Sequence, residues 1–140
     1  MKLLLDVNPL IAAICGNHTE NGRVLAWIAS LKTREFITCP IVELGFVRIT
    51  VATRLQPGIP EARDALERWK KAAQARFVAD DIPASGLPDW VASAGKTTDA
   101  HLWALAQSLG AEFATMDEGL MDRALCIPRL PPRSRAKSEA

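Results

Sequence analysis

The chain has 140 residues, a length typical of one domain with a sizeable core, and its apolar and charged fractions are those of an ordinary globular protein. The formal net charge of +1 neither favours nor excludes nucleic acid as a partner. Three widely spaced cysteines without a CxxC pair argue against a disulfide framework and a zinc site, and no apolar stretch approaches the roughly 18 residues of a membrane span. We therefore expect a cytoplasmic protein without a signal peptide or a membrane segment.

Strand-like and helix-like segments alternate along the sequence. Short β-prone runs predict strands at residues 2–7, 35–39, 76–80 and 111–117. Apolar spacing of helical period predicts helices at residues 9–16, 22–32, 40–55, 60–74 and 97–110. Residues 82–96 are mostly connection with one turn of helix, and residues 118–130 hold a short helix and a final edge strand. This alternation predicts an α/β domain with a mainly parallel sheet and helices on both faces.

The basic residues concentrate at the C-terminus, where the last twelve residues hold four Lys or Arg and one Glu. The composition predicts that residues 131–140 form a basic, disordered tail on a slightly acidic body. A tail of this kind either contacts phosphates or only keeps the protein in solution, and the sequence favours neither interpretation.

The first candidate site residue is Asp6, which ends the apolar run KLLLDV, where a buried charge needs a partner. Asn8 and Pro9 are predicted to supply the N-cap and the first position of the following helix, so capping does not explain Asp6. Asp117 ends the strand AEFATMD in the same way. Because ligands of α/β sheets bind beyond the carboxyl ends of the strands, we expect both aspartates at a binding edge.

Two further acids lie on the apolar faces of their predicted helices. Asp99 is in register with Leu102 on a core-facing stripe, where an acid that only meets the helix dipole need not be. Glu43 shares a face with Phe46 and has no Lys or Arg three or four residues away. The inward-facing carboxylates are therefore Asp6, Glu43, Asp99 and Asp117. They would repel one another without a cation, and Mg²⁺ or Mn²⁺ is the natural choice for oxygen ligands. Such a site suits phosphodiester cleavage, in which metal activates water and stabilises the leaving oxygen.

Three segments, LLDVN, CPIVELGFVRI and TTDAHLWALAQSLGAEFATMD, resemble in order and spacing the PIN-domain proteins of the VapC-like toxin group, over residues 1–130. The resemblance implies a metal-dependent endoribonuclease with a three-layer α/β/α fold, which leaves 5′-phosphate and 3′-hydroxyl ends. It also implies a homodimer and an antitoxin whose C-terminal segment blocks the acidic groove. The residues that the resemblance implies as catalytic metal-site acids are Asp6, Glu43, Asp99 and Asp117, with Asn8 and Thr115 as supporting hydrogen-bonding groups.

Other polar residues have weaker interpretations. Lys96, Arg123 and the basic tail are candidates for contacts with RNA phosphates. His18 is interpreted as solvated and His101 as a surface or packing residue, because neither has the Ser or Cys context of a catalytic triad. No element that reads RNA bases is evident, so the sequence does not predict which RNA is cut.

Other functions stay open from the residues alone. A Mg²⁺-dependent phosphatase or phosphotransferase would use Asp6 as nucleophile, but Asn8 stands where haloacid-dehalogenase-like enzymes need an acid for proton transfer. A phosphoryl-accepting receiver domain would need an acid pair after the first strand, whereas the pair Asp80-Asp81 follows a later one. A non-catalytic PIN-like module that binds RNA or protein is the third alternative, and the intact set of acids argues against it.

Overall fold

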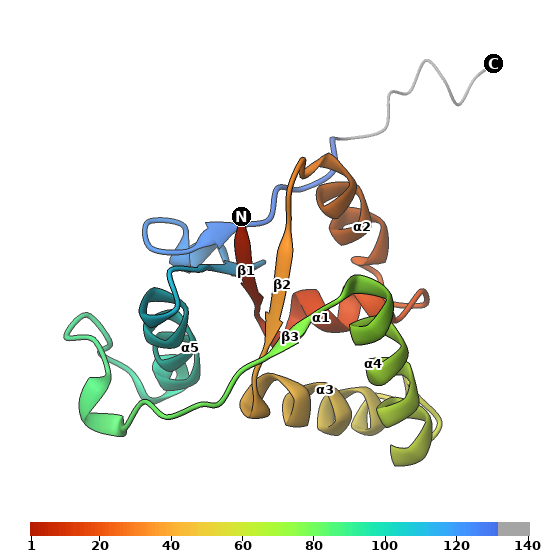
Figure 1. The fold of residues 1–140 in the computed structure, drawn as a ribbon, viewed down its shortest axis with the longest axis horizontal. Coiled ribbons are helices and arrows are strands. Elements are labelled where there is room, and N and C mark those ends of the chain that lie inside the picture. The colour runs from red at the N-terminus through yellow and green to blue at the C-terminus, as the bar shows by residue number, and fades with distance from the viewer. Residues whose placement is uncertain (132–140) are drawn as a thin grey trace.

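The sheet is parallel throughout the part of the chain that the computed structural model describes, residues 1–131 (Figure 1). The strand order is β3-β2-β1-β4-β5, with β1 in the centre, and every neighbouring pair is parallel. The strands are β1 (Lys2–Leu5), β2 (Glu35–Thr38), β3 (Arg76–Phe77), β4 (Glu112–Thr115) and β5 (Leu125–Cys126). The mainly parallel sheet and the edge position of the last strand are confirmed. Apart from Pro131, the tail predicted for residues 131–140 lies outside the described residues.

Five α-helices occur in the described residues, at the places that the apolar spacing predicts. They are α1 (Val7–Ile14), α2 (Asn21–Ser30), α3 (Pro40–Ala52), α4 (Ile59–Ala73) and α5 (Thr97–Ser108). The short 3-10 turns are η1 (Ala84–Gly86), η2 (Ala94–Lys96) and η3 (Glu118–Leu120). The connection before α5 thus holds two turns where the sequence predicted one.

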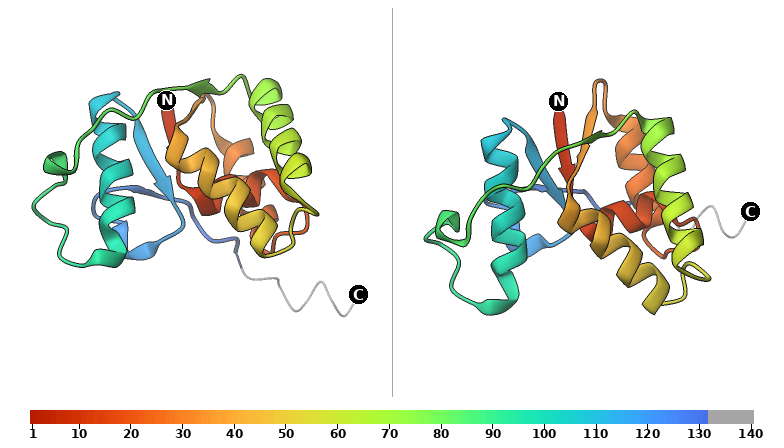
Figure 2. Two further views of the ribbon diagram at one scale, coloured as in Figure 1. Left: turned by 90° about the horizontal axis from the view of Figure 1, so that it is seen from below. Right: turned by 60° about the horizontal axis from the view of Figure 1, so that its bottom comes forward.

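The strand order places the helices on both faces of the sheet. From β1 to β3 the chain moves outward in one direction, and from β3 it crosses back to β4 on the other side of β1. Because crossovers between parallel strands are right-handed, the two directions put their helices on opposite faces. Helices α1 to α4 accordingly lie on one side and α5 on the other (Figures 1 and 2). This is the predicted three-layer α/β/α arrangement, and its order reverses between β1 and β4.

The core forms around β1, the central strand. Leu3, Leu4 and Leu5 are all buried, because both faces of a central parallel strand are covered by helices. On the helical side, α3 crosses α1 so closely that a Cβ added at Gly45 would lie 2.9 Å from a methyl carbon of Val7. A glycine at this position therefore allows the two helices to approach.

The start of α1 differs from the sequence prediction. Asp6, not Asn8, is the N-cap: its backbone is extended and its carboxylate accepts a hydrogen bond from the Val7 N–H. Asn8 and Pro9 lie inside the first turn, where proline is also tolerated because the early N–H groups have no partner in the helix. The helix ends with Cys15 as its C-cap, one residue before the predicted Gly16. The claim that capping does not explain Asp6 was therefore wrong.

None of the helices in residues 1–131 combines the length and the apolar character that crossing a membrane requires.

Candidate functional site

Asp6 lies where β1 ends, at the point of reversal in the sheet order. Its backbone N–H donates to the Ala114 carbonyl at 2.9 Å, which continues the pairing of β1 with β4. Its carboxylate is held on both sides, because Oδ1 accepts from the Val7 N–H at 2.7 Å and Oδ2 accepts from the Thr115 hydroxyl at 3.0 Å. These bonds fix the carboxylate at the crevice in which α/β sheets usually bind ligands.

Thr115 connects this aspartate to the next one. It is the last residue of β4 and is buried, and its hydroxyl oxygen accepts a hydrogen bond from the Asp117 N–H at 3.1 Å while donating to Asp6. The Asp117 carboxylate then caps η3 by accepting from the Gly119 N–H at 2.9 Å. The resemblance implies a supporting hydrogen bond from Thr115, and the Thr115 hydroxyl does donate to a candidate site acid, Asp6.

Asp99 reaches the same edge of the sheet from the opposite layer, in the first turn of α5. The aspartates change one another's pKa values. The pKa of Asp6 is raised to about 6: burial contributes most, the negative charges of Asp99 and Asp117 add to the rise, and the hydrogen bonds from Val7 and Thr115 oppose it. Burial also raises the pKa of Asp99, while the nearby Lys96 opposes that shift and Asp117 adds to it. Three carboxylates from β1, α5 and the end of β4 therefore share one negative field.

Lys96, the last residue of η2, sits against two of these acids. Its ammonium group contacts the Asp117 carboxylate directly and lies 4.0 Å from an oxygen of Asp99. The contact lowers the pKa of Asp117, an effect that the Gly119 N–H reinforces, and it raises the pKa of Lys96 itself. A positive charge thus compensates part of the acid cluster.

Glu43 is on the first turn of α3, where the sequence predicts it, but its contacts are different ones. Its Oε2 accepts from the Thr38 hydroxyl at 2.6 Å and pairs with the Lys70 ammonium at 2.9 Å. Neither partner is three or four residues away, so the search for a local counter-ion missed Lys70, which α4 brings from 27 residues further along the chain. Glu43 therefore belongs to the same edge of the sheet but not to the charge field that perturbs Asp6.

Asn8 is exposed on the first turn of α1, and within residues 1–131 its side chain makes no hydrogen bond to a candidate site acid. The structure does not bring it to the aspartates as it brings Thr115.

An aspartate–histidine pair beside the site was not predicted. Both oxygens of Asp80, which follows β3, lie within 2.7–2.8 Å of Nε2 of His101 on α5, and both side chains are largely buried. The interpretation of His101 as a surface or packing residue is therefore incomplete. The only signal in the sequence is that Asp80 follows a strand, as Asp6 and Asp117 do.

The donor chemistry of the aspartate cluster fits a hard divalent cation. Its acids offer only carboxylate oxygens, the ligands that Mg²⁺ and Mn²⁺ prefer. The pKa of Asp6 is raised first by burial and then by the negative charges of Asp99 and Asp117, and a bound cation would offset those charges. The Asp117 carboxylate already pairs with a positive group, the Lys96 ammonium. The acids are neighbours rather than a closed shell, because no three His, Cys, Asp or Glu side chains in residues 1–131 converge as ready-formed metal ligands.

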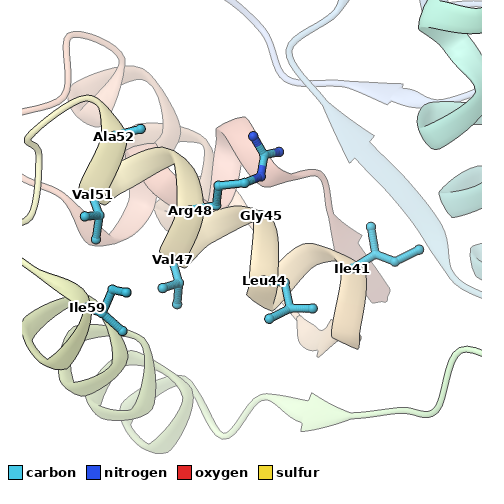
Figure 3. Close-up of a pocket in the computed structure, with 8 residues that line it drawn as sticks. All are labelled: Ile41, Leu44, Gly45, Val47, Arg48, Val51, Ala52 and Ile59. Atoms are coloured by element: carbon cyan, nitrogen blue, oxygen red, sulfur yellow. The ribbon is translucent and has the colours of Figure 1, made fainter.

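An apolar groove of about 760 Å³, whose lining includes none of the aspartates, lies between α3 and the start of α4 (Figure 3). Val47 and Val51 of α3 face Ile59 of α4 across it. Leu44 and Ile59, which line it, are 70% and 55% exposed.

Comparisons with known proteins agree on one family. A family model described as "PIN domain" matches residues 3–124. Ribonuclease VapC38 of Mycobacterium tuberculosis is 34% identical over 133 residues, which cover 91% of this chain and 94% of the relative. The crystal structure of M. tuberculosis VapC20, a Sarcin-Ricin loop cleaving toxin, has a TM-score of 0.64 at 13% identity, with 90% of this chain and 99% of that chain covered. The structure of VapBC2 from Rickettsia felis, bound to a DNA fragment from their promoter, has a TM-score of 0.58 at 13% identity, with 91% and 96% covered.

Proposed function

The chain belongs to the PIN-domain family, and on that premise we propose that it is a VapC-like toxin, a metal-dependent endoribonuclease that hydrolyses RNA phosphodiester bonds. The observation that carries the proposal is that Asp6, Asp99 and Asp117 lie close enough at the reversal point of the sheet to affect one another's ionisation, with the pKa of Asp6 raised to about 6 by burial first and then by the charges of Asp99 and Asp117. Neighbouring carboxylates that disfavour one another's charge are typical of sites that bind a cation, and the capping contacts of Asp6 and Asp117 are compatible with that role.

The site residues divide two tasks in the proposed reaction, which are holding the cation and orienting its ligands. Asp6, Asp99 and Asp117 would hold the cation, and Glu43 would join them from α3. Thr115 orients Asp6, since its hydroxyl donates to Oδ2 and its oxygen accepts from the backbone of Asp117. A bound divalent cation supplies a water of lowered pKa and a positive charge for the scissile phosphate and the leaving oxygen.

The protein contributes the burial and the fixed orientation of the Asp6 carboxylate. Burial of Asp6 keeps bulk water away from one side of its carboxylate, so its interaction with a cation is screened less than on an open surface. The fixed hydrogen bonds from Val7 and Thr115 restrict the carboxylate to one orientation before any cation arrives. We propose Mg²⁺ or Mn²⁺ as the cation, and products with 5′-phosphate and 3′-hydroxyl ends.

The proposed partners are RNA, a cognate antitoxin and a second copy of the chain. The R. felis VapBC2 structure supports the antitoxin, because that relative of the fold is a toxin–antitoxin assembly. The exposed apolar side chains of Leu44 and Ile59 support protein contacts at the α3–α4 groove. The free thiols of Cys15, Cys39 and Cys126 support the reducing cytoplasm as the proposed location.

RNA cleavage by purified protein and by single Asp-to-Asn variants at positions 6, 99 and 117 tests this function. With Mn²⁺ present, the cleavage rate of each variant should fall by more than about 100-fold. Substitution of residues that only hydrogen-bond to metal ligands already costs about 10–100-fold, and loss of a ligand should cost more. The Asp64→Asn variant is the matched control, since Asp64 is exposed on α4 and should leave the rate unchanged. Wild-type rates in all three site variants would refute the assignment. Hydrolysis of phosphomonoesters but not RNA would assign the site to a phosphatase.

A further inference from the structure

Lys96 is the cation that acts on the site aspartates: its ammonium group lowers the pKa of Asp117 and opposes the rise in the pKa of Asp99. Its ammonium contacts Asp117 and lies 4.0 Å from Asp99. The residue ends η2, immediately before α5, so its backbone is anchored beside the acids while its side chain is 44% exposed. In residues 1–131 the ion pairs of Lys96 are made with these two acids alone.

Lys70, which pairs with Glu43, is held in a different way. It is only 16% exposed and pairs with Glu67 at 3.2 Å as well as with Glu43 at 2.9 Å. Its ammonium also lies 5.3 Å from the centre of the Phe77 ring. Two carboxylates and an aromatic face thus fix Lys70, and one of those carboxylates and the ring lie outside the candidate site. Within residues 1–131, Lys96 has no comparable anchor outside the site.

We propose that Lys96 is an internal counter-cation of the acidic site, which leaves Asp117 and Asp99 when a divalent cation binds and then contacts an RNA backbone phosphate. The proposal rests on the proposed function, because it takes the aspartates to be the cation ligands. Two cations cannot share the same carboxylate oxygens without repulsion, and a divalent ion attracts the aspartates more strongly than an ammonium group. A lysine side chain is long, flexible and a compact point charge, so the displaced ammonium stays within reach of an anion bound at the site.

The proposal predicts two opposite effects of one substitution. Lys96→Met removes the competing cation, so Mn²⁺ should bind without RNA about threefold more tightly, as expected for loss of a partly exposed ion pair. The same variant should cleave RNA more weakly at saturating Mn²⁺, with a higher KM for RNA and a smaller change in kcat. A residue that only stabilises the fold would not tighten Mn²⁺ binding.

Calorimetric Mn²⁺ titration and steady-state RNA cleavage test both effects in the full chain. Lys96→Arg keeps the charge and should stay near the wild type in both measurements. Lys71→Met is the matched control, because Lys71 is exposed on the last turn of α4 and its loss changes the net charge equally. Tighter Mn²⁺ binding in Lys96→Met but not in Lys71→Met supports the proposal.

Other outcomes separate this inference from the proposed function. Unchanged or weaker Mn²⁺ binding by Lys96→Met would overturn the counter-cation role, and an unchanged KM for RNA would overturn the phosphate contact. Both conclusions require that the wild type binds Mn²⁺ and that Asp6→Asn weakens the binding. If Asp6→Asn binds Mn²⁺ as the wild type does, the proposed metal site itself is wrong.

Discussion

Asp6 makes the metal-free protein less stable at neutral pH than it would be with a neutral side chain. Its pKa rises from an ordinary 3.8 to about 6 in the folded protein, mainly because burial disfavours the charge. Folding therefore favours the protonated acid. The stability from this group is fully present below pH 3.8, falls as the pH rises through about 6, and is absent above.

The size of the effect follows from the pKa shift. The rise in the pKa of Asp6 from 3.8 to about 6 corresponds to about 3 kcal/mol of unfolding free energy. The Asp6→Asn variant cannot ionise, and its amide oxygen can still accept from the Val7 N–H. The hydrogen bond with Thr115 must be rearranged, which costs part of the gain. We expect Asp6→Asn to be more stable than the wild type by about 1–3 kcal/mol at pH 8, and to have no advantage at pH 3.5.

Urea unfolding of both proteins in EDTA, from pH 3.5 to 8, measures this difference. The advantage of Asp6→Asn should grow between about pH 4 and pH 6 and stay constant above, following the titration of Asp6. Added Mn²⁺ should stabilise the wild type more than the variant, since the cation replaces the proton as the partner of the carboxylate. A variant that is less stable than the wild type by the same amount at every pH would refute the reasoning.

Three further substitutions test the packing around the site. Thr115→Val removes the hydroxyl that serves two aspartates, so Mn²⁺ affinity should fall by about tenfold or more in a calorimetric titration, and unchanged affinity would contradict its supporting role. His101→Ala leaves the largely buried carboxylate of Asp80 without its partner and should lower the unfolding free energy by about 3 kcal/mol in urea; a loss below about 1 kcal/mol would mean that the pair is solvated. Gly45→Val places side-chain atoms against Val7 and should cost about 1–3 kcal/mol in thermal unfolding, whereas a stabilised variant would show that α3 can shift without loss.

Much of the fold follows from local patterns in the sequence. The continuous apolar run in β1 predicts a strand buried on both faces, and Pro40 with its apolar spacing predicts the start of α3. Because strands and helices alternate, the parallel sheet follows from the same patterns. The two aspartates that end β1 and β4 are then brought together by topology alone, which is why Asp6 and Asp117 could be predicted.

Other features depend on contacts that no local pattern encodes. Lys70 reaches Glu43 only because α4 packs on α3. His101 reaches Asp80 only because the connection after β3 crosses back towards α5 (Figure 1). The N-cap of α1 was misassigned because Asn8-Pro9 and Asp6 both carry capping signals, and the extended backbone at Asp6 decides between them. Asp6 therefore serves a structural and a proposed chemical role at once, since its two oxygens face different partners.

Removal and return of the divalent cation, with the RNA ends identified, tests the central claim most directly. EDTA-treated protein should not cleave RNA, and added Mn²⁺ or Mg²⁺ should restore cleavage with 5′-phosphate and 3′-hydroxyl products, as expected when a cation activates water for attack on phosphorus. Cleavage that persists in EDTA and leaves 2′,3′-cyclic phosphates would contradict the account, because attack by the ribose 2′-hydroxyl needs no cation held by Asp6, Asp99 and Asp117.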